Sequence, residues 1–226
     1  MNHPSLLAIE TSVETGSVAL WRNEKLVLER SFFAGRKPSG TLWPALQEVM
    51  PEEDALRHPL SAIVVGIGPG SYNGSRVGIA AAQGIALVHK CGIAPLCSFE
   101  GVSSASKEAL AIGDARRGSF SLQPIAEGRL KGDFALVEEE ELSEAIRAAH
   151  EKGQDIFSFD ASERFPVSDK LKALIQQRQS QAGLLAKAFA QRSQEEQKEL
   201  FKNAPEPFYL RDPHITVGKR KSLLER

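Results

Sequence analysis

A glycine-rich run between a predicted strand and a predicted helix constrains the fold of this chain more than any other feature. The glycines of residues 66–78 are Gly66, Gly68, Gly70, Gly74 and Gly78. Residues 61–65 before the run are β-branched and apolar, as in a buried strand, and residues 77–88 have a helix's Ala-rich composition. Because a strand, a glycine-rich turn and a helix N-terminus commonly bind anions, the first hypothesis is a phosphate loop.

The spacing of the glycines excludes the two common phosphate motifs. A Walker A loop needs Gly, four residues and then Gly-Lys-Ser/Thr, yet no lysine follows at that spacing in any register. A dinucleotide fingerprint needs a third glycine three residues after the second, and Ser71 and Asn73 occupy those positions. Neither motif is present.

The composition is that of a globular protein with a substantial core. The 226 residues are 42% hydrophobic and 25% charged, enough for one large domain or two small ones. A formal charge of -1 supplies no global field that would attract nucleic acid or an anionic membrane. The concentrated basic stretch Lys219-Arg220-Lys221 is predicted to be a solvated terminus.

Cysteine spacing and the N-terminal sequence favour a cytoplasmic protein. Cys91 and Cys97 match neither a zinc-ligand pair nor a redox pair, so inert free thiols are expected. Pro4 and Glu10 interrupt any apolar N-terminal region, so no signal peptide is expected. No apolar run approaches the length that spans a bilayer, and no membrane partner is expected.

Apolar periodicity predicts two related α/β lobes. In the first half, strands are predicted at residues 5–9, 17–21, 26–33 and 61–65, and helices at 41–50 and 76–90. Pro44 is expected in the first turn of its helix, where proline is tolerated. In the second half, strands are predicted at residues 93–98, 119–125, 129–137 and 155–159, and helices at 101–110, at 139–152 and in a long region that ends near residue 202.

Two short polar segments could meet an anionic ligand. Glu10, Thr11 and Ser12 end the first predicted strand, where they could contact a phosphate or its metal ion. A polar turn that bonds to its own backbone is the alternative. Residues 114–118, Asp-Ala-Arg-Arg-Gly, could also contact an anion, or form a surface loop with a local ion pair.

The sequence predicts no catalytic residue and no metal ligand. The five histidines, which include His89 and His150, show no pair at the close spacing of a metal site. No serine lies in a Gly-x-Ser-x-Gly elbow, although the sequence does not exclude a Ser-His-Asp triad assembled from distant residues.

The helix predicted after the glycine run carries small residues at four-residue spacing. One strip is Gly74, Gly78 and Ala82, and the other is Ala80, Gly84 and Val88. Small residues let another backbone approach closely, which could be the chain's own sheet or a second protein. Because two strips exceed what one sheet face needs, and Trp43 and Met50 lie off the core stripe of the preceding helix, we predict an exposed apolar patch that binds a protein.

At several of these segments the sequence resembles the TsaB family, also called YeaZ. The resemblance rests on residues 9–12 (Ile-Glu-Thr-Ser), residues 16–20 (Gly-Ser-Val-Ala-Leu) and the whole run over residues 66–87. Weaker matches follow in the same order at residues 98–104, 114–118 and 208–211. The resemblance is dense over residues 5–118 and sparse afterwards, and the glycine run is its most specific element.

The resemblance implies an α/β fold of the actin-like ATPase (ASKHA) class with two ribonuclease-H-like lobes. The N-terminal lobe would span residues 1–105 and carry partner-binding helices. A shorter, divergent C-terminal lobe with a basic tail would span residues 106–226. The implied role is that of a non-catalytic scaffold in tRNA threonylcarbamoyladenosine synthesis, which dimerises with the catalytic subunit TsaD and activates it.

The family pairs through the two helices of its N-terminal lobe, here near residues 41–50 and 76–90. The candidate interface residues are Leu42, Trp43, Leu46, Met50, Arg76, Gly78, Ile79 and Ala82. Further implied partners are the ATPase TsaE, tRNA through the complex, and a second copy of this chain when TsaD is absent. No cofactor is expected in this chain, and ATP or ADP at the subunit junction is left open.

Three departures from the family pattern bear on nucleotide binding. Glu10 stands where the family usually has aspartate, and Ser39-Gly40 replaces a His-Ser pair at the start of the first helix. Residues 158–161, Ser-Phe-Asp-Ala, replace a glycine-bearing turn in the second lobe. The main alternative is a stand-alone ATPase or phosphotransferase, which needs phosphate contacts around Thr11 and Asp160. A peptidase is the weakest alternative.

Overall fold

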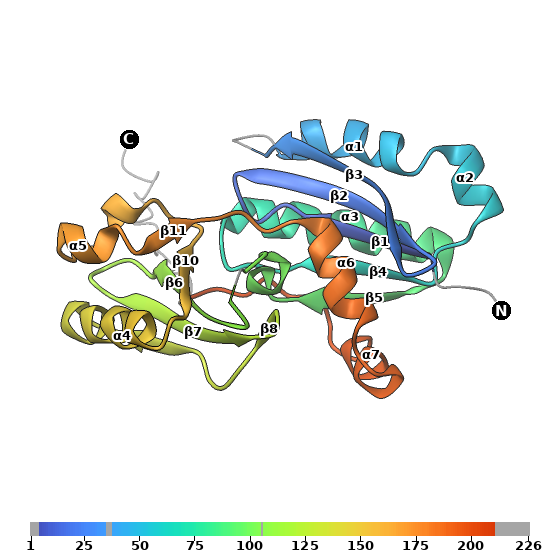
Figure 1. Cartoon of the computed structure of the whole chain (residues 1–226). Coiled ribbons are helices and arrows are strands. Elements are labelled where there is room, and N and C mark those ends of the chain that lie inside the picture. The colour runs from blue at the N-terminus through green and yellow to red at the C-terminus, as the bar shows by residue number, and fades with distance from the viewer. Residues whose placement is uncertain (1–4, 35–37, 105, 211–226) are drawn as a thin grey trace, which may run out of the picture.

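Two sheets, one from each half of the chain, organise the structure, a computed structural model that describes residues 5–34, 38–104 and 106–210 (Figure 1). The first sheet has the order β3-β2-β1-β4-β5. Its strands are β1 (Ser5–Glu10), β2 (Thr15–Arg22), β3 (Lys25–Phe33), β4 (Ala62–Gly66) and β5 (Gly92–Leu96). β2 pairs antiparallel with β1 and β3, whereas β4 runs parallel to β1 and β5. β1 and β4 are buried at every position, as expected of central strands with both faces covered.

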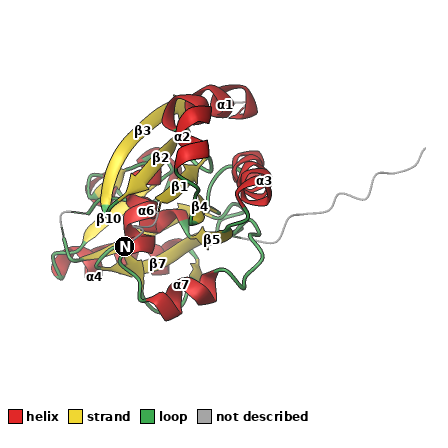
Figure 2. Ribbon diagram, turned by 90° about the vertical axis from the view of Figure 1, so that its right-hand side faces the viewer, coloured by secondary structure: helices red, strands yellow, loops and turns green. Residues whose placement is uncertain are grey.

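Helices cover both faces of the first sheet. α1 (Pro38–Val49) and α3 (Tyr72–His89) lie side by side on one face (Figure 2), and α2 (Glu52–Arg57) follows α1. α6 (Ala182–Ala190) packs on the other face, where Leu185 and Phe189 join the core formed by Leu6 and Val64. α7 (Gln194–Leu200) follows α6 and contacts β5. The first lobe is therefore completed by residues 182–200, which follow the second sheet in the chain.

The second sheet repeats the strand order of the first when it is read in the opposite direction, with β6 in the place of β1. Its order is β11-β10-β6-β7-β8, and β9 also pairs with β7. The strands are β6 (Glu108–Asp114), β7 (Phe120–Ala126), β8 (Arg129–Leu130), β9 (Ala135–Val137), β10 (Asp155–Ser158) and β11 (Ile175–Gln177). As in the first sheet, the central strand has an antiparallel neighbour on one side and parallel strands on the other. α4 (Glu139–Glu151) covers one face with Leu142 and Ile146, and α5 (Asp169–Lys172) is a single turn.

Two of the predicted helical regions are wrong. Residues 98–101 form a 3-10 helix, η1 (Ser98–Gly101), and residues predicted as helix up to 110 enter the central strand β6. The long helix predicted to residue 202 is divided into η2 (Ser162–Arg164), α5, β11, α6 and α7. In both regions, pairing with neighbouring strands overrides a local composition that favours helix.

Pro44 also differs from its predicted position. Because α1 begins at Pro38, Pro44 lies inside the helix and not in its first turn, on the exposed side next to Trp43.

The lobe boundary near residues 105/106 stays a prediction. α6, which falls within the predicted second lobe, packs on the first sheet. The basic stretch Lys219-Arg220-Lys221 lies outside the described residues. Within the described parts of the chain, no helix is both long and apolar enough to cross a membrane.

Candidate functional site

The glycines after β4 are needed because they face other parts of the same chain. A Cβ on Gly70 would overlap the backbone carbonyl of Ser12, and one on Gly74 would overlap that of Thr11. A Cβ on Gly78 would overlap the Thr11 hydroxyl. Gly70 also has φ +151°, a conformation that residues with side chains rarely adopt. The glycine run therefore lets the start of α3 pack closely on the turn after β1.

The same holds for the first two glycines of the run. Gly66 lies against the carboxylate of Glu10, and Gly68 lies against the backbone carbonyl of Phe208, 2.9 Å from where its Cβ would be. Gly68 has φ +102°. At the positions where their Cβ atoms would lie, Gly66 and Gly68 therefore meet other parts of the chain, so close packing explains why these residues are glycines.

Glu10, Thr11 and Ser12, the weak candidates for nucleotide binding, bond to their own chain. The Ser12 amide and hydroxyl both donate to Glu10 Oε1, each at 2.7 Å, and the Thr11 hydroxyl donates to the Gly74 carbonyl at 2.8 Å. The Ser12 and Ser98 hydroxyls are 2.9 Å apart. All three candidates are buried, and Glu10 Oε2 has no partner among the described residues. These contacts match the polar-turn alternative.

A cavity of about 520 Å³ lies between the two lobes. Thr11, Ser12 and the Gly70–Ser71 turn line its first-lobe side, and Asp114 with Asp160 lines its second-lobe side. Glu10 does not line it. The two polar segments predicted from sequence therefore meet at one cavity, although they come from opposite lobes.

Ion pairs hold the second-lobe side of this cavity. Asp114 pairs with Arg116 and with Arg164, both at 3.2 Å, and Arg164 pairs with Asp160 at 3.2 Å. The Asp160 carboxylate also accepts a hydrogen bond from the backbone amide of Asp114 at 3.0 Å. Burial raises the pKa of Asp160, and the nearby Asp114 charge adds to this effect. The predicted local ion pair at residues 114–118 is present.

The charges that line this cavity are unfavourable for the phosphates of a nucleotide. The carboxylates among the lining residues, Glu14, Asp114 and Asp160, outnumber the guanidinium groups, Arg116 and Arg164, and both guanidinium groups are already paired. The Thr11 hydroxyl is also engaged within the chain. A polyphosphate would therefore have to displace existing ion pairs from a wall that carries excess negative charge.

The predicted interface residues divide into buried and exposed sets. Those buried in the chain's own core are Leu42, Leu46, Gly78, Ile79 and Ala82. Trp43 and Arg76 are exposed, and Met50 is half-buried. The interface as a whole stays a prediction, but the five buried residues are not available to a partner on the surface of this chain.

The two strips of small residues on α3 have different surroundings. Gly74, Gly78 and Ala82 face the sheet, whereas Ala80, Gly84 and Val88 face solvent. Leu87 and Val88 are 81% and 78% exposed, and Trp43 on the neighbouring α1 is 52% exposed. We call Trp43, Ala80, Gly84, Leu87 and Val88 the outer apolar strip. Sequence reasoning found the two strips but did not tell which one faces inward.

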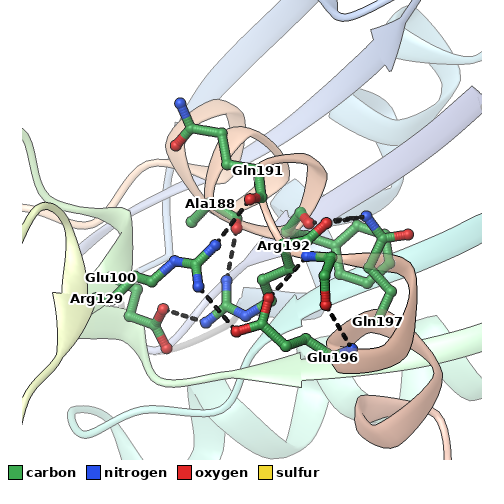
Figure 3. Close-up of polar contacts among 9 residues, drawn as sticks. Glu100, Arg129, Ala188, Gln191, Arg192, Glu196 and Gln197 are labelled. Carbon is green, nitrogen blue, oxygen red and sulfur yellow. Dashed lines mark hydrogen bonds and ion pairs between the residues drawn. The ribbon is translucent and has the colours of Figure 1, made fainter.

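A group of charged residues that the sequence did not predict ties the end of α6 to the second lobe (Figure 3). Arg192 pairs with the buried carboxylate of Glu100 and donates to the carbonyl of Ala188. Arg129 of β8 donates to the Gln191 carbonyl at 2.8 Å and to Glu196 at 3.0 Å. Burial raises the pKa of Glu100, against the opposing effect of Arg192. Glu100, Arg129 and Arg192 lie far apart in sequence, and no local motif connects them.

Among the described residues, no three His, Cys, Asp or Glu side chains are grouped so that they could hold a metal ion. Cys91 is half-buried and Cys97 is buried, and neither forms a disulfide.

The strand order shared by the two sheets, with a cavity between them, defines the actin-like ATPase (ASKHA) fold class with two ribonuclease-H-like lobes. Two solved structures from Pseudomonas aeruginosa have this architecture with a TM-score of 0.67 each: an uncharacterized protein with similarity to peptidase YEAZ, and YeaZ. They are 24% and 23% identical to this chain. The matches cover 92% and 91% of this chain, and 100% and 99% of the two solved chains. This likeness shows the fold.

Residues 33–206 match the profile of the family described as TsaD: tRNA N6-adenosine threonylcarbamoyltransferase. The chain is also 29% identical over 141 residues to the tRNA threonylcarbamoyladenosine biosynthesis protein TsaB of Haemophilus influenzae, and 37% identical over 82 residues to that of Escherichia coli. These matches cover 59% and 36% of this chain, and the chain spans 59% and 35% of those relatives. The chain belongs to this family, among its TsaB (YeaZ) members.

Proposed function

We propose that this chain is a non-catalytic scaffold subunit that pairs with a TsaD-like catalytic subunit and activates it in the synthesis of tRNA threonylcarbamoyladenosine. The observation that carries the proposal is the outer apolar strip on α1 and α3. The curated relatives, which are named for the biosynthesis of this modified nucleoside, support the choice of pathway. We further propose that the protein acts in the cytoplasm and meets tRNA through the complex.

The physical properties of the outer apolar strip support protein binding. Leu87 and Val88 leave apolar surface in water, and covering such side chains contributes roughly 1.5–3 kcal/mol each. A Cβ on Gly84 would meet no atom within 4 Å, so a second backbone can approach α3 closely at this point. Tight helix packing against a partner subunit requires both properties.

A pair of matched substitutions tests the proposal. Ala80→Glu places a charge in the outer apolar strip, and Ala148→Glu places the same charge on the exposed side of α4 in the second lobe. We expect Ala80→Glu to weaken pairing with TsaD from the same organism by about tenfold or more in analytical ultracentrifugation, and Ala148→Glu to leave it unchanged. Equal pairing by both variants would contradict the proposed interface.

An activity assay tests the scaffold role separately. We expect tRNA modification with TsaD, TsaE and this chain together, and none with this chain alone. Robust modification by the isolated chain would exclude a non-catalytic role.

A stand-alone ATPase or phosphotransferase is the second candidate, because Thr11 and Ser12 line the cavity between the lobes. The paired guanidinium groups and excess carboxylates of that cavity count against it. Calorimetric titration of the isolated chain with ATP and magnesium distinguishes the two candidates. Micromolar binding would favour the enzyme, whereas binding that needs TsaD would place ATP or ADP at the subunit junction.

We also propose that TsaE joins the pair, and that two copies of this chain associate through the same strip when TsaD is absent. A concentration series of the isolated chain in analytical ultracentrifugation, with and without Ala80→Glu, tests the second point.

A further inference from the structure

We infer that Arg76 and the C-terminal segment over residues 205–210 form a pre-oriented binding site for a carboxylate of the partner subunit. We call residues 205–210 the C-terminal strap. The inference rests on the proposed pairing through α3, and it adds a charged contact together with the segment that positions it.

Arg76 is held in one orientation by two tyrosines. Its guanidinium carbon lies 3.9 Å from the ring centre of Tyr72, and its Nε donates to the Tyr209 hydroxyl at 3.2 Å. The rings of Tyr72 and Tyr209 stack with their centroids 5.1 Å apart and 23° between their planes. Tyr72 belongs to α3 and Tyr209 to the C-terminal strap, so the strap and the helix position the guanidinium together.

The terminal nitrogens of Arg76 remain available to a ligand. They carry four N–H groups, and within the described parts of the chain they have no hydrogen-bond acceptor and no carboxylate partner. Arg30 and Arg164, in contrast, pair with carboxylates of this chain. A planar, exposed guanidinium fork matches a carboxylate that binds through both oxygens.

The C-terminal strap is anchored on both sides of Tyr209. The Phe208 amide donates to the Ile67 carbonyl at 2.8 Å, and the Phe208 ring meets Phe134 edge to face with centroids 5.4 Å apart. Leu210 lies against Gly113 of β6. Anchors on both lobes therefore fix Tyr209, and a fixed Arg76 loses less conformational entropy when its ligand binds.

The surroundings of Arg76 favour a protein carboxylate. Ala80 and Gly84 follow Arg76 along the exposed side of α3 at four-residue intervals, and Leu87 and Val88 continue the apolar surface. A partner helix with one acidic residue beside small or apolar residues would cover the strip and reach the guanidinium at once. A nucleic-acid backbone would leave the apolar surface in contact with phosphates and water.

The test is the affinity of the full chain for TsaD of the same organism, measured at several salt concentrations. We expect Arg76→Gln to weaken pairing by about tenfold or more and to flatten its salt dependence. Arg76→Lys keeps the charge but lacks the planar guanidinium fork, so its affinity should lie between those of the wild type and Arg76→Gln. Tyr209→Phe keeps the ring stack but loses the hydrogen bond, so it should weaken pairing several-fold with the salt dependence retained.

Arg147→Gln on the exposed side of α4 is the matched control and should pair as the wild type does. If the wild-type chain does not pair with TsaD, the proposed function and this inference both fail. If the wild type pairs and Arg76→Gln pairs equally well, only this inference is overturned. It is also overturned if Arg76→Gln leaves pairing intact but weakens tRNA binding by the complex, which would indicate a phosphate contact. Thermal unfolding of each variant confirms that the comparison is between folded proteins.

Discussion

The carboxylate of Glu10 occupies the space where a side chain on Gly66 would lie. The two residues stand at the ends of the neighbouring parallel strands β1 and β4. Glu10 is fully buried and accepts two hydrogen bonds from Ser12. An acid one methylene longer than aspartate thus fits here because the residue opposite has no side chain.

Gly66→Ala should destabilise the protein, because its Cβ would overlap Glu10 Oε2. We expect a loss of about 1–3 kcal/mol in the free energy of unfolding by urea, typical of overpacking. Adding Glu10→Asp should restore part of it, because the shorter acid withdraws from the contact. Gly84→Ala is the control, with open space around its Cβ in an exposed helix, and should gain up to about 1 kcal/mol. Equal effects at the two glycines would contradict this explanation.

Gly78 should affect stability and not pairing. Gly78 and Ala82 are candidate interface residues from the sequence, but both are buried against the sheet. Gly78→Glu should therefore lower the melting temperature sharply, whereas Gly84→Glu should leave it close to that of the wild type and weaken pairing. Differential scanning fluorimetry and ultracentrifugation separate the two effects. A Gly78→Glu variant that folds normally and fails to pair would reverse the assignment of the strips.

The buried carboxyl group of Glu100 should make stability depend on pH. Burial raises the pKa of Glu100 above its ordinary value of 4.5, so the folded state binds a proton that the unfolded state has already released. The contribution of Glu100 is therefore fully present below pH 4.5 and declines as the pH rises through the raised pKa. The stability of the wild type relative to Glu100→Gln should fall over that interval and then level off. Urea unfolding between pH 4 and pH 8 measures the difference, and an increase with pH would contradict the assignment.

Arg129 should hold the α6–α7 junction to the second lobe. Arg129→Gln removes the donors to the Gln191 carbonyl and to Glu196, so amide hydrogen exchange in α7 should become faster. Arg147→Gln, which alters another exposed arginine of the second lobe, should leave it unchanged. Mass spectrometry after deuterium labelling provides the readout.

Cys97 should resist alkylation in the folded protein. Burial raises the pKa of its thiol to about 12, so little thiolate exists near neutral pH, and the side chain is shielded from solvent. Iodoacetamide at pH 8 should modify Cys97 only after unfolding, which peptide mass spectrometry can show. Rapid modification in the native state would contradict the buried position.

Local sequence patterns predicted the first lobe better than the second. The central strands β1 and β4 are continuous apolar runs, and the glycine run marks the turn between β4 and α3, so each could be identified from its own residues. β6 and β11 were missed, because their Ala-rich and Gln-rich residues become strands only through pairing with β7 and β10. The strand order depends on contacts of this kind, which the resemblance implied and periodicity did not reveal.

The candidate surface was predictable in kind but not in detail. Four-residue spacing identified small residues on α3, but the direction in which each strip faces depends on where Thr11 packs. The position of Arg76 was equally hidden, because its tyrosine partner Tyr209 lies 133 residues further along the chain.

The place of α6 in the first lobe has a consequence for the order of synthesis. One face of the first sheet, with Leu6, Ala8 and Val64, is covered by Leu185 and Phe189 of α6. The Ser17 hydroxyl accepts a hydrogen bond from the backbone amide of Ala182 at the start of α6. While the ribosome is still making the second lobe, that apolar face is without its cover. The N-terminal lobe therefore cannot finish folding when its own strands emerge, and chaperones have a defined surface to bind until α6 arrives.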